Sequence, residues 1–199
     1  MKVLILAEYY PREGDAVLGV WAHRQAVAAR EAGADVRVLV LHRPVPPLAA
    51  IRTGDVRGAL ATIRQSRAAQ LDGIPIDYIR YLSPPRPWSY RSWGAWAAPS
   101  LRRALRRIRR QFPFELIHAH YAVPAGDAVR RVAPGVPLVV SVHGHDVQGP
   151  GAGGANVRAT LAHATLVIAN SSGTSRRCLA LGARATRVVH LGTDVPTQP

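Results

Sequence analysis

Residues 114–147 read FELIHAHYAVPAGDAVRRVAPGVPLVVSVHGHDV, and this stretch decides the fold. It contains two short apolar runs, residues 116–117 and 138–140, which are typical of buried strands. Residues 124–132 between them have helical composition, and the Pro-Gly pair that follows at 134–135 is typical of a helix end. The stretch therefore predicts a strand–helix–strand unit with parallel strands.

Each apolar run leads into two histidines that are separated by one residue. Because side chains alternate along a strand, both imidazoles of a pair are predicted to point to the same face. The carboxyl ends of parallel strands meet at one edge of an open α/β sheet, and ligands bind in the crevice there. The polar side chains predicted at this edge are His118, His120, His143, His145 and Asp146. This edge is the predicted functional site.

Similar apolar runs recur along the chain and alternate with segments of helical pattern. The predicted strands are residues 2–7, 36–41, 74–81, 165–169 and 187–190, and the predicted helices are 20–32, 56–70, 99–111, 156–163 and, with its N-cap residues, 170–181. This alternation predicts an α/β fold, a single doubly wound Rossmann-like domain over residues 1–199. Its mostly parallel sheet is expected to have about seven strands.

The composition is that of a globular protein, with 48% hydrophobic residues. The longest apolar runs are far shorter than the ~18 residues of a membrane-spanning helix. A single cysteine, Cys178, excludes an internal disulfide framework and fits a reducing compartment. We therefore expect a cytoplasmic protein.

The positive charge is unevenly spread. The chain has a net charge of +14, and residues 86–110 hold eight arginines and no acid. Residues 99–111 form a predicted amphipathic helix whose apolar stripe is surrounded by arginine. One interpretation is a helix that covers the sheet and turns a solvated arginine face outward. The other is that Trp88–Arg110 binds an anionic membrane surface, which makes the protein peripheral on the inner face of the membrane.

The loop after the first strand carries neither a G-x-G-x-x-G nor a G-x-x-x-x-G-K-[ST] motif, so no glycine-rich nucleotide loop of those types is predicted. Gly19 stands directly before the helix predicted over residues 20–32. The free amides at the start of that helix suit an anion. The alternative is that Gly19 only permits a turn.

Several segments carry a family resemblance. They are KVLILAEYYP with LGVWAHRQAVAAREAGADVRVL (residues 2–11 and 18–39), FELIHAHYAVPAG (114–126), VPLVVSVHGHDV (136–147) and TLVIANSSGTSRRCLALGARATRVVHLGTDV (165–195). Taken in this order, they resemble the N-terminal domain of the family 4, GT-B-fold retaining glycosyltransferases. The resemblance spans nearly the whole chain and is weakest between about Pro44 and Pro99.

The resemblance implies transfer of a sugar from a nucleotide-sugar donor to a hydroxyl acceptor, with retention and without a metal or other cofactor. Members of the family usually have a second domain that carries most of the donor site. By this resemblance, we expect the chain to be the acceptor-binding half, one half of a GT-B fold, without the C-terminal donor-binding domain. We therefore expect it to be inactive as a transferase on its own.

The resemblance also assigns roles to single residues. His143 matches a histidine near the anomeric centre that contacts donor and acceptor, and it is the expected catalytic residue. Tyr121 matches a position that lines the acceptor pocket. Gly19 matches the glycine-rich loop near the donor diphosphate, although this chain has Leu18 and Gly19 where many members have two glycines.

The geometry of the strand ends adds further residues. His120 and Asp146 lie beside the matched positions and are expected to bind the acceptor with Tyr121. His118 is expected to be structural.

Two other functions stay open at this point. Tryptophans among arginines in Trp88–Arg110 suit a module that binds an anionic surface or stacks on single-stranded nucleic acid. No recognised nucleic-acid motif accompanies them, so nucleic acid is not the expected partner. The two His-x-His pairs suit a metal-dependent hydrolase if the strand ends bring both pairs within ligand distance.

Overall fold

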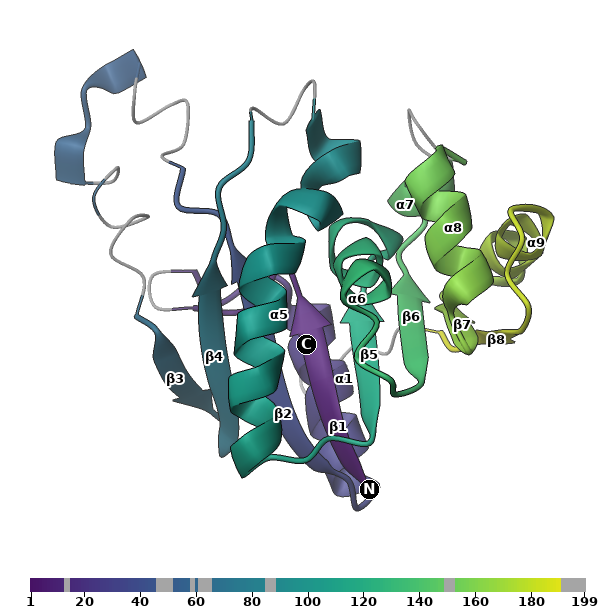
Figure 1. Ribbon diagram of the computed structural model, residues 1–199, viewed down its shortest axis with the longest axis horizontal. Coiled ribbons are helices and arrows are strands. Elements are labelled where there is room, and N and C mark those ends of the chain that lie inside the picture. The colour runs from purple at the N-terminus through teal and green to yellow at the C-terminus, as the bar shows by residue number, and fades with distance from the viewer. Residues whose placement is uncertain are drawn as a thin grey trace, which may run out of the picture.

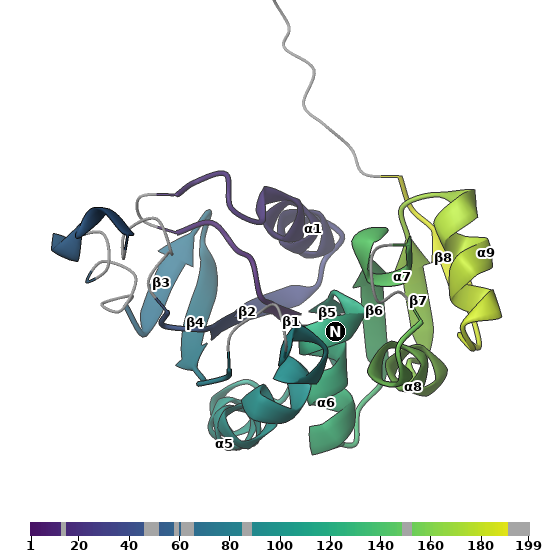
Figure 2. The same ribbon diagram turned by 90° about the horizontal axis from the view of Figure 1, so that it is seen from above.

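The structure is a computed structural model that describes residues 1–12, 15–45, 52–57, 60, 66–84, 89–148 and 153–190. They form three layers, with one central sheet that has helices on both faces (Figures 1 and 2). None of the helices in these ranges is long and apolar enough to cross a membrane.

The sheet contains eight strands within the described residues. They are β1 (Lys2–Ala7), β2 (Asp35–His42), β3 (Ala68–Leu71), β4 (Ile74–Arg80), β5 (Leu116–His120), β6 (Leu138–Val142), β7 (Leu166–Ala169) and β8 (Thr186–Val188). Their order across the sheet is β3-β4-β2-β1-β5-β6-β7-β8 (Figure 1). Every neighbouring pair is parallel except β3 with β4. The predicted doubly wound, mostly parallel α/β fold is confirmed.

The helices cover the two faces unequally. They are α1 (Val20–Glu31), the 3-10 turn η1 (Tyr90–Ser92), α5 (Trp93–Gln111), η2 (Ala122–Gly126), α6 (Asp127–Val132), α7 (His145–Gln148), α8 (Ala155–His163) and α9 (Ser172–Ala180). Helix α1 covers one face, whereas α5, α6 and α8 cover the other (Figure 2). Helix α9 packs against β7 and β8.

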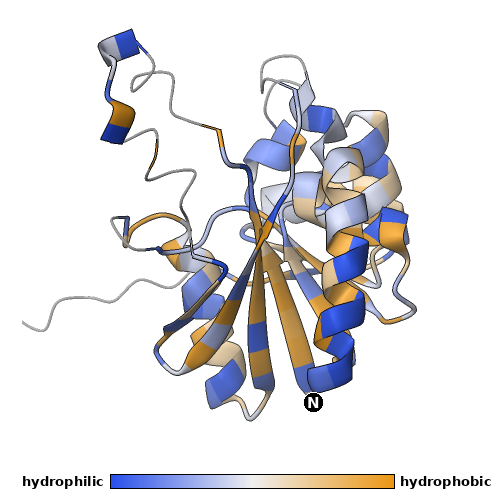
Figure 3. Cartoon of the chain, turned by 60° about the vertical axis from the view of Figure 1, so that its left-hand side comes forward, coloured by the Kyte–Doolittle hydropathy of each residue, from blue (hydrophilic) through white to orange (hydrophobic). Residues whose placement is uncertain are grey.

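Strand β1 shows why its sequence is apolar at nearly every position. Its side chains alternate between the two faces, and both faces lie under helices. Ile5 packs with Ala26 in the core beneath α1. Leu4 and Leu6 pack with Leu101 in the core beneath α5. The strands are accordingly hydrophobic where they run between the helix layers (Figure 3).

Helix α5 begins at Trp93, six residues before the predicted start at Pro99, which lies inside the helix. Its apolar stripe faces the sheet, with Leu101 at 0% and Ile108 at 1% exposure. The interpretation of α5 as a helix that covers the sheet is therefore correct. Its arginines lie on the remaining, solvent-facing side.

The tryptophans near α5 have different environments. Trp93 is buried at 3% exposure, whereas Trp96 is 50% exposed. Trp88 lies outside the described residues. Binding of an anionic membrane through this region stays a prediction, since it rests on charge and on one exposed indole.

Residues 68–70 were predicted to end a helix, and that prediction was wrong. They belong to β3, which pairs antiparallel with β4. The connecting residues Asp72 and Gly73 have φ angles of 47° and 74°, which suit a two-residue hairpin turn. The Asp-Gly pair is a strong hairpin signal that outweighs the helical composition before it. Much of the remaining predicted helix over 56–70 lies outside the described ranges.

The prediction that His143 and His145 share a strand face was also wrong. Strand β6 ends at Val142, and His145 is the first residue of α7. Gly144 adopts a φ of 85°, which turns the chain away from the strand direction. His145 is exposed as a result.

Candidate functional site

The carboxyl ends of β1, β5 and β6 form one edge of the sheet, termed the crevice, at which the strand order reverses. From β1 the chain proceeds through α1 to β2 on one side, whereas β5 is followed by α6 and β6 on the other. Such a reversal of strand order is where open α/β sheets bind ligands. The segments that reach this edge begin at Glu8, Tyr121 and His143.

His143 lies among aromatic rings at this edge. Its ring centroid is 4.8 Å from that of Tyr121 and 5.9 Å from that of Trp21. The side chain is half-buried, and burial lowers the pKa of His143 to about 4. His143 is therefore a neutral imidazole at physiological pH.

His120 holds the ring of His143 from beneath. The Nδ1 atom of His120 lies 3.2 Å from the Nε2 atom of His143, and the two rings are inclined by only 18°. His120 itself is 1% exposed, and burial, followed by the nearby His118 and His143, lowers its pKa well below 6.5. Two neutral imidazoles therefore share one hydrogen bond.

The direction of this hydrogen bond follows from the second nitrogen of His120. Its Nε2 atom is buried and has no hydrogen-bond partner among the described residues. Nε2 is unpaired in either tautomer, and a buried N–H without an acceptor is rarer than a buried acceptor without a donor. We therefore assign the proton to Nδ1 of His120, which donates to Nε2 of His143. His143 then carries its own proton on Nδ1 and acts as a hydrogen-bond donor from that atom.

His118 belongs to a different chain of hydrogen bonds. Its Nε2 atom lies 2.8 Å from the Ser141 hydroxyl, which in turn donates to the side-chain oxygen of Gln25 at 3.1 Å. Because the Ser141 proton goes to Gln25, the Ser141 oxygen accepts from the N–H of His118. Burial lowers the pKa of His118 to about 4. His118 thus links β5, β6 and α1, which is the kind of structural role expected for it.

Tyr121 follows β5 in a backbone conformation that bulky residues seldom adopt, with φ at 74° and ψ at 138°. Its N–H donates to the Ser141 carbonyl at 2.9 Å, and its own carbonyl accepts from Gly126 at 3.1 Å. The ring meets Tyr9 edge-on at 5.8 Å. These contacts hold a strained residue beside His143, and such strain is frequent at functional sites.

Asp146 has a partner in the backbone. One carboxylate oxygen accepts from the N–H of Ala122 at 2.8 Å, so the side chain ties α7 to the segment after β5. Burial raises the pKa of Asp146 to about 7, and the nearby Glu8 also contributes to the rise. Asp146 therefore holds Tyr121 in place through the next peptide, beside any contact it makes with an acceptor.

Gly19 lies directly before α1 with a φ of 67°. A Cβ atom at this position would collide with the carbonyl group of Tyr9, so the loop after β1 passes directly against Gly19. Both the backbone angle and the close approach require glycine. The contact brings the start of α1 to the same edge as Tyr9; a diphosphate at this helix start stays a prediction.

Three residues at this edge were not singled out from the sequence: Glu8, Trp21 and Tyr90. The Tyr90 hydroxyl lies 3.1 Å from a carboxylate oxygen of Glu8 and 3.3 Å from the carbonyl of Val123. Glu8 directly follows β1, so the strand-end argument applied to the histidines would also have found it. Tyr90 comes from η1, and only the tertiary structure brings it here.

The metal hypothesis needed both histidine pairs to converge, and they do not. His118, His120 and His143 come together, whereas His145 is exposed on α7. Within the described ranges, no group of three or more His, Cys, Asp or Glu side chains is arranged to hold a metal ion.

A comparison with models of protein families identifies the family of this chain. The model of Glycosyltransferase Family 4 matches residues 3–196. The chain belongs to glycosyltransferase family 4. The match covers nearly the whole chain, including the region between Pro44 and Pro99 where the resemblance was weakest by eye. A comparison with curated protein sequences found no significant match.

Solved structures resemble this family 4 domain in fold. Sucrose-phosphate synthase from Thermosynechococcus elongatus aligns with a TM-score of 0.67 at 13% identity, over 98% of this chain and 49% of that one. HepE from Anabaena, in complex with UDP, aligns with a TM-score of 0.54 at 20% identity, over 98% and 45%. A UDP-GlcNAc 2-epimerase from Neisseria meningitidis aligns with a TM-score of 0.54 at 14% identity, over 96% and 46%.

These similarities have two consequences for the family 4 domain. The chain spans about half the length of each of these three structures. At such low identity the three structures establish the fold alone. One of them is an epimerase, so the shared fold does not by itself fix the reaction. The functional assignment therefore rests on family membership and on the residues of the crevice.

Proposed function

We propose that this family 4 domain is the acceptor-binding half of a retaining glycosyltransferase that takes a nucleotide sugar as donor and a hydroxyl as acceptor. The observation that carries the proposal is the position of His143. It stands at the carboxyl end of β6, in the crevice where strand order reverses, in a chain that belongs to family 4. UDP is bound by the similar Anabaena protein, which supports a nucleotide-linked donor.

In this proposal His143 acts as a donor of a hydrogen bond. The proton on Nδ1 is available to an oxygen of the sugar or the acceptor, because Nε2 is occupied by His120. A neutral imidazole with this tautomer positions substrates and does not remove the proton of the acceptor. The departing diphosphate is stabilised by cationic groups and helix N-termini, as in other phosphate sites. No metal or other cofactor is required.

Tyr121 and Asp146 have complementary parts in the same proposal. The Tyr121 ring forms an apolar wall beside His143, suited to the face of a sugar or an apolar acceptor. Asp146 fixes the backbone that carries this wall. His120 is completely covered and acts through His143, so it is a positioning residue.

The test is sugar transfer by a protein that contains both halves of the GT-B fold, with this chain alone beside it. We expect transfer by the complete protein and none by the isolated chain. His143→Ala should lower kcat by about a hundredfold, in the range of other transition-state hydrogen bonds. His163→Ala, at the exposed end of α8, is the matched control and should retain activity. An unchanged kcat in the His143 variant, with correct folding, would remove the role given to His143.

The alternatives have less support. The apolar stripe of α5 is buried against the sheet, so it is not available to enter a membrane. His145 turns away from the other three histidines, which removes the two-pair geometry on which a metal-dependent hydrolase was based. Location in the cytoplasm stays a prediction that rests on the single buried Cys178.

A further inference from the structure

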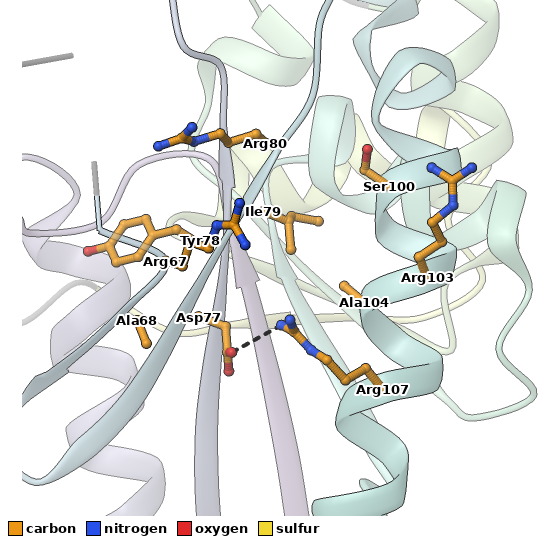
Figure 4. Close-up of a pocket in the computed structure, with 10 residues that line it drawn as sticks. All are labelled: Arg67, Ala68, Asp77, Tyr78, Ile79, Arg80, Ser100, Arg103, Ala104 and Arg107. Atoms are coloured by element: carbon orange, nitrogen blue, oxygen red, sulfur yellow. Dashed lines mark hydrogen bonds and ion pairs between the residues drawn. The ribbon is translucent and has the colours of Figure 1, made fainter. Parts of the chain in front are cut away.

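A second concave site lies away from the crevice, between β4 and α5 (Figure 4). Its volume is about 480 Å³, within the range of ~300–1,000 Å³ found for small-ligand pockets. The strand wall is formed by β4, and the helix wall by the middle of α5. Strands β2 and β1 separate β4 from β5, so this cleft is distinct from the crevice around His143.

The cleft is lined mainly by positive charge. Arginines line it from both sides, Arg67 from the strand side and Arg103 and Arg107 from α5, whereas the guanidinium of Arg80 points away from α5 (Figure 4). The lining residues are Arg67, Ala68, Asp77, Tyr78, Ile79, Arg80, Ser100, Arg103, Ala104 and Arg107. Arg67, Arg103 and Arg107 thus share the cleft with one acid, Asp77.

That acid is already neutralised. One oxygen of Asp77 lies 2.8 Å from the guanidinium of Arg37, and the other lies 3.2 Å from the guanidinium of Arg107. Asp77 is therefore shared between two arginines, which already offset its single negative charge. Neither Arg67 nor Arg103 has an acidic partner among the described residues.

Arginines gathered in this way repel one another unless an anion lies between them. Arg103 and Arg107 are one helical turn apart, so they present guanidinium groups on the same side of α5. Asp77 contacts the Arg107 side chain, which orients the remaining N–H donors of that guanidinium in the cleft. Planar guanidinium groups bind phosphate oxygens in pairs. The Ser100 hydroxyl adds a polar group on the helix wall.

A second cleft on α5 differs from the first in where its arginines come from. There Arg102, Arg106 and Arg109 lie beside Phe114 and Pro134 in a cleft of about 320 Å³. Arg109 donates to the Pro134 carbonyl at 2.8 Å and lies over the Phe114 ring at 5.2 Å. That cleft draws its arginines from α5 alone, whereas the first draws them from α5 and from Arg67, which directly precedes β3.

We propose that the cleft between β4 and α5 binds a phosphate monoester or diphosphate group. The ligand is a small phosphorylated molecule or the phosphorylated headgroup of a lipid, since both present the same oxygens to the arginines. The cleft has room for a phosphate and part of the group attached to it. This proposal does not depend on glycosyl transfer, because it concerns a different part of the domain.

The first arm of the test uses inorganic pyrophosphate and calorimetric titration of the chain at low ionic strength. Arg103→Ala should weaken binding about tenfold, as expected for the loss of one charge-assisted contact. Arg106→Ala is the matched control, because it removes the same charge from the same helix on a different side. Both positions are exposed on a helix, and the unfolding temperature of each variant confirms that it folds.

The second arm uses phosphatidylcholine vesicles that contain phosphatidate, whose headgroup is a phosphate monoester, or phosphatidylglycerol, whose phosphate is a diester. Preference for phosphatidate that is lost in Arg103→Ala identifies a lipid source. Pyrophosphate binding with no preference between the vesicles identifies a soluble source. Equal weakening by Arg103→Ala and Arg106→Ala, or no binding of pyrophosphate, overturns the proposal, because a general basic surface then explains the charge.

Discussion

The Nδ1 atom of His120 lies 3.2 Å from the Nε2 atom of His143, and this hydrogen bond joins the end of β5 to the residue after β6. His120 is buried, whereas His143 lies half-buried in the crevice. The contact therefore lets a covered residue decide which nitrogen of the site histidine carries a proton. In the proposed reaction this choice makes Nδ1 of His143 the hydrogen-bond donor toward the substrate.

Replacing His120 tests this control of the tautomer. In His120→Ala the Nε2 atom of His143 loses its donor, so we expect both tautomers of His143 to be populated and transfer by the complete enzyme to fall about tenfold. Nitrogen-15 NMR of the ring distinguishes the two tautomers directly. His120→Asn can place an N–H near the former Nδ1, so it should restore much of the lost transfer activity and the single tautomer of His143. A His143 ring that keeps one tautomer in His120→Ala would contradict the assignment.

The histidines predict how stability depends on pH. His118 and His143 have folded pKa values of about 4 against an ordinary 6.5, and the pKa of His120 is also lowered. At pH values between about 4 and 6.5 the unfolded chain binds more protons than the folded chain. The free energy of unfolding therefore falls as the pH falls from about 6.5 towards about 4. Urea unfolding across this window measures the loss. Stability that is flat or rises on acidification would contradict it.

Asp146 acts in the opposite direction. Its folded pKa is about 7 against an ordinary 3.8, so in the same window the folded state holds a proton that the unfolded chain has lost. This favours the folded state at low pH and partly offsets the histidines. Asp146→Asn removes the offset, and the pH slope should steepen by about 1.4 kcal/mol per pH unit. Asp35→Asn, at an exposed position, is the control and should leave the slope unchanged.

Gly19 and Gly33 form a matched pair for measuring the close approach at the start of α1. Both have positive φ, 67° and 86°, but a Cβ at Gly33 meets nothing within 4 Å, whereas a Cβ at Gly19 collides with the Tyr9 carbonyl. Gly33→Ala should lower the free energy of unfolding by about 1 kcal/mol, because alanine disfavours this backbone angle. Gly19→Ala should cost at least about 2 kcal/mol more, because the loop must move. Equal unfolding free energies for the two variants would show that the loop yields freely.

Asp127 is the most buried charge at the junction of α5 and α6. Its side chain is 0% exposed and lies 2.6 Å from Arg130 and 2.8 Å from Arg131. Asp127→Ala leaves these two partly buried arginines without their carboxylate and should lower the unfolding free energy by about 3 kcal/mol. Asp77→Ala is the comparison, and its loss should be smaller because Arg107 is 61% exposed. Denaturant unfolding of both variants decides the order.

Several features of the fold could be predicted from local patterns. Strand β1 was expected at residues 2–7 and forms over Lys2–Ala7. Helix α1 ends at Glu31 before Gly33, as the glycine predicts. Ser171 caps α9 by accepting from the Thr174 N–H, as its position before the helix indicated. Each of these depends on neighbours within a few residues, which is why periodicity and capping chemistry are sufficient to find them.

The sequence by itself therefore determined the order of most elements, β3 excepted, and the placement of His118, His120 and His143 at strand ends. The tertiary structure decided which of those histidines meet. Strand register sets His120 beside Ser141, and the positive φ of Gly144 turns His145 out of the crevice. It also decided the proton positions on His120 and His143 and the arginine cleft between β4 and α5. These depend on contacts between residues far apart in the chain, because burial and distance, not local pattern, fix hydrogen-bond partners and gather like charges.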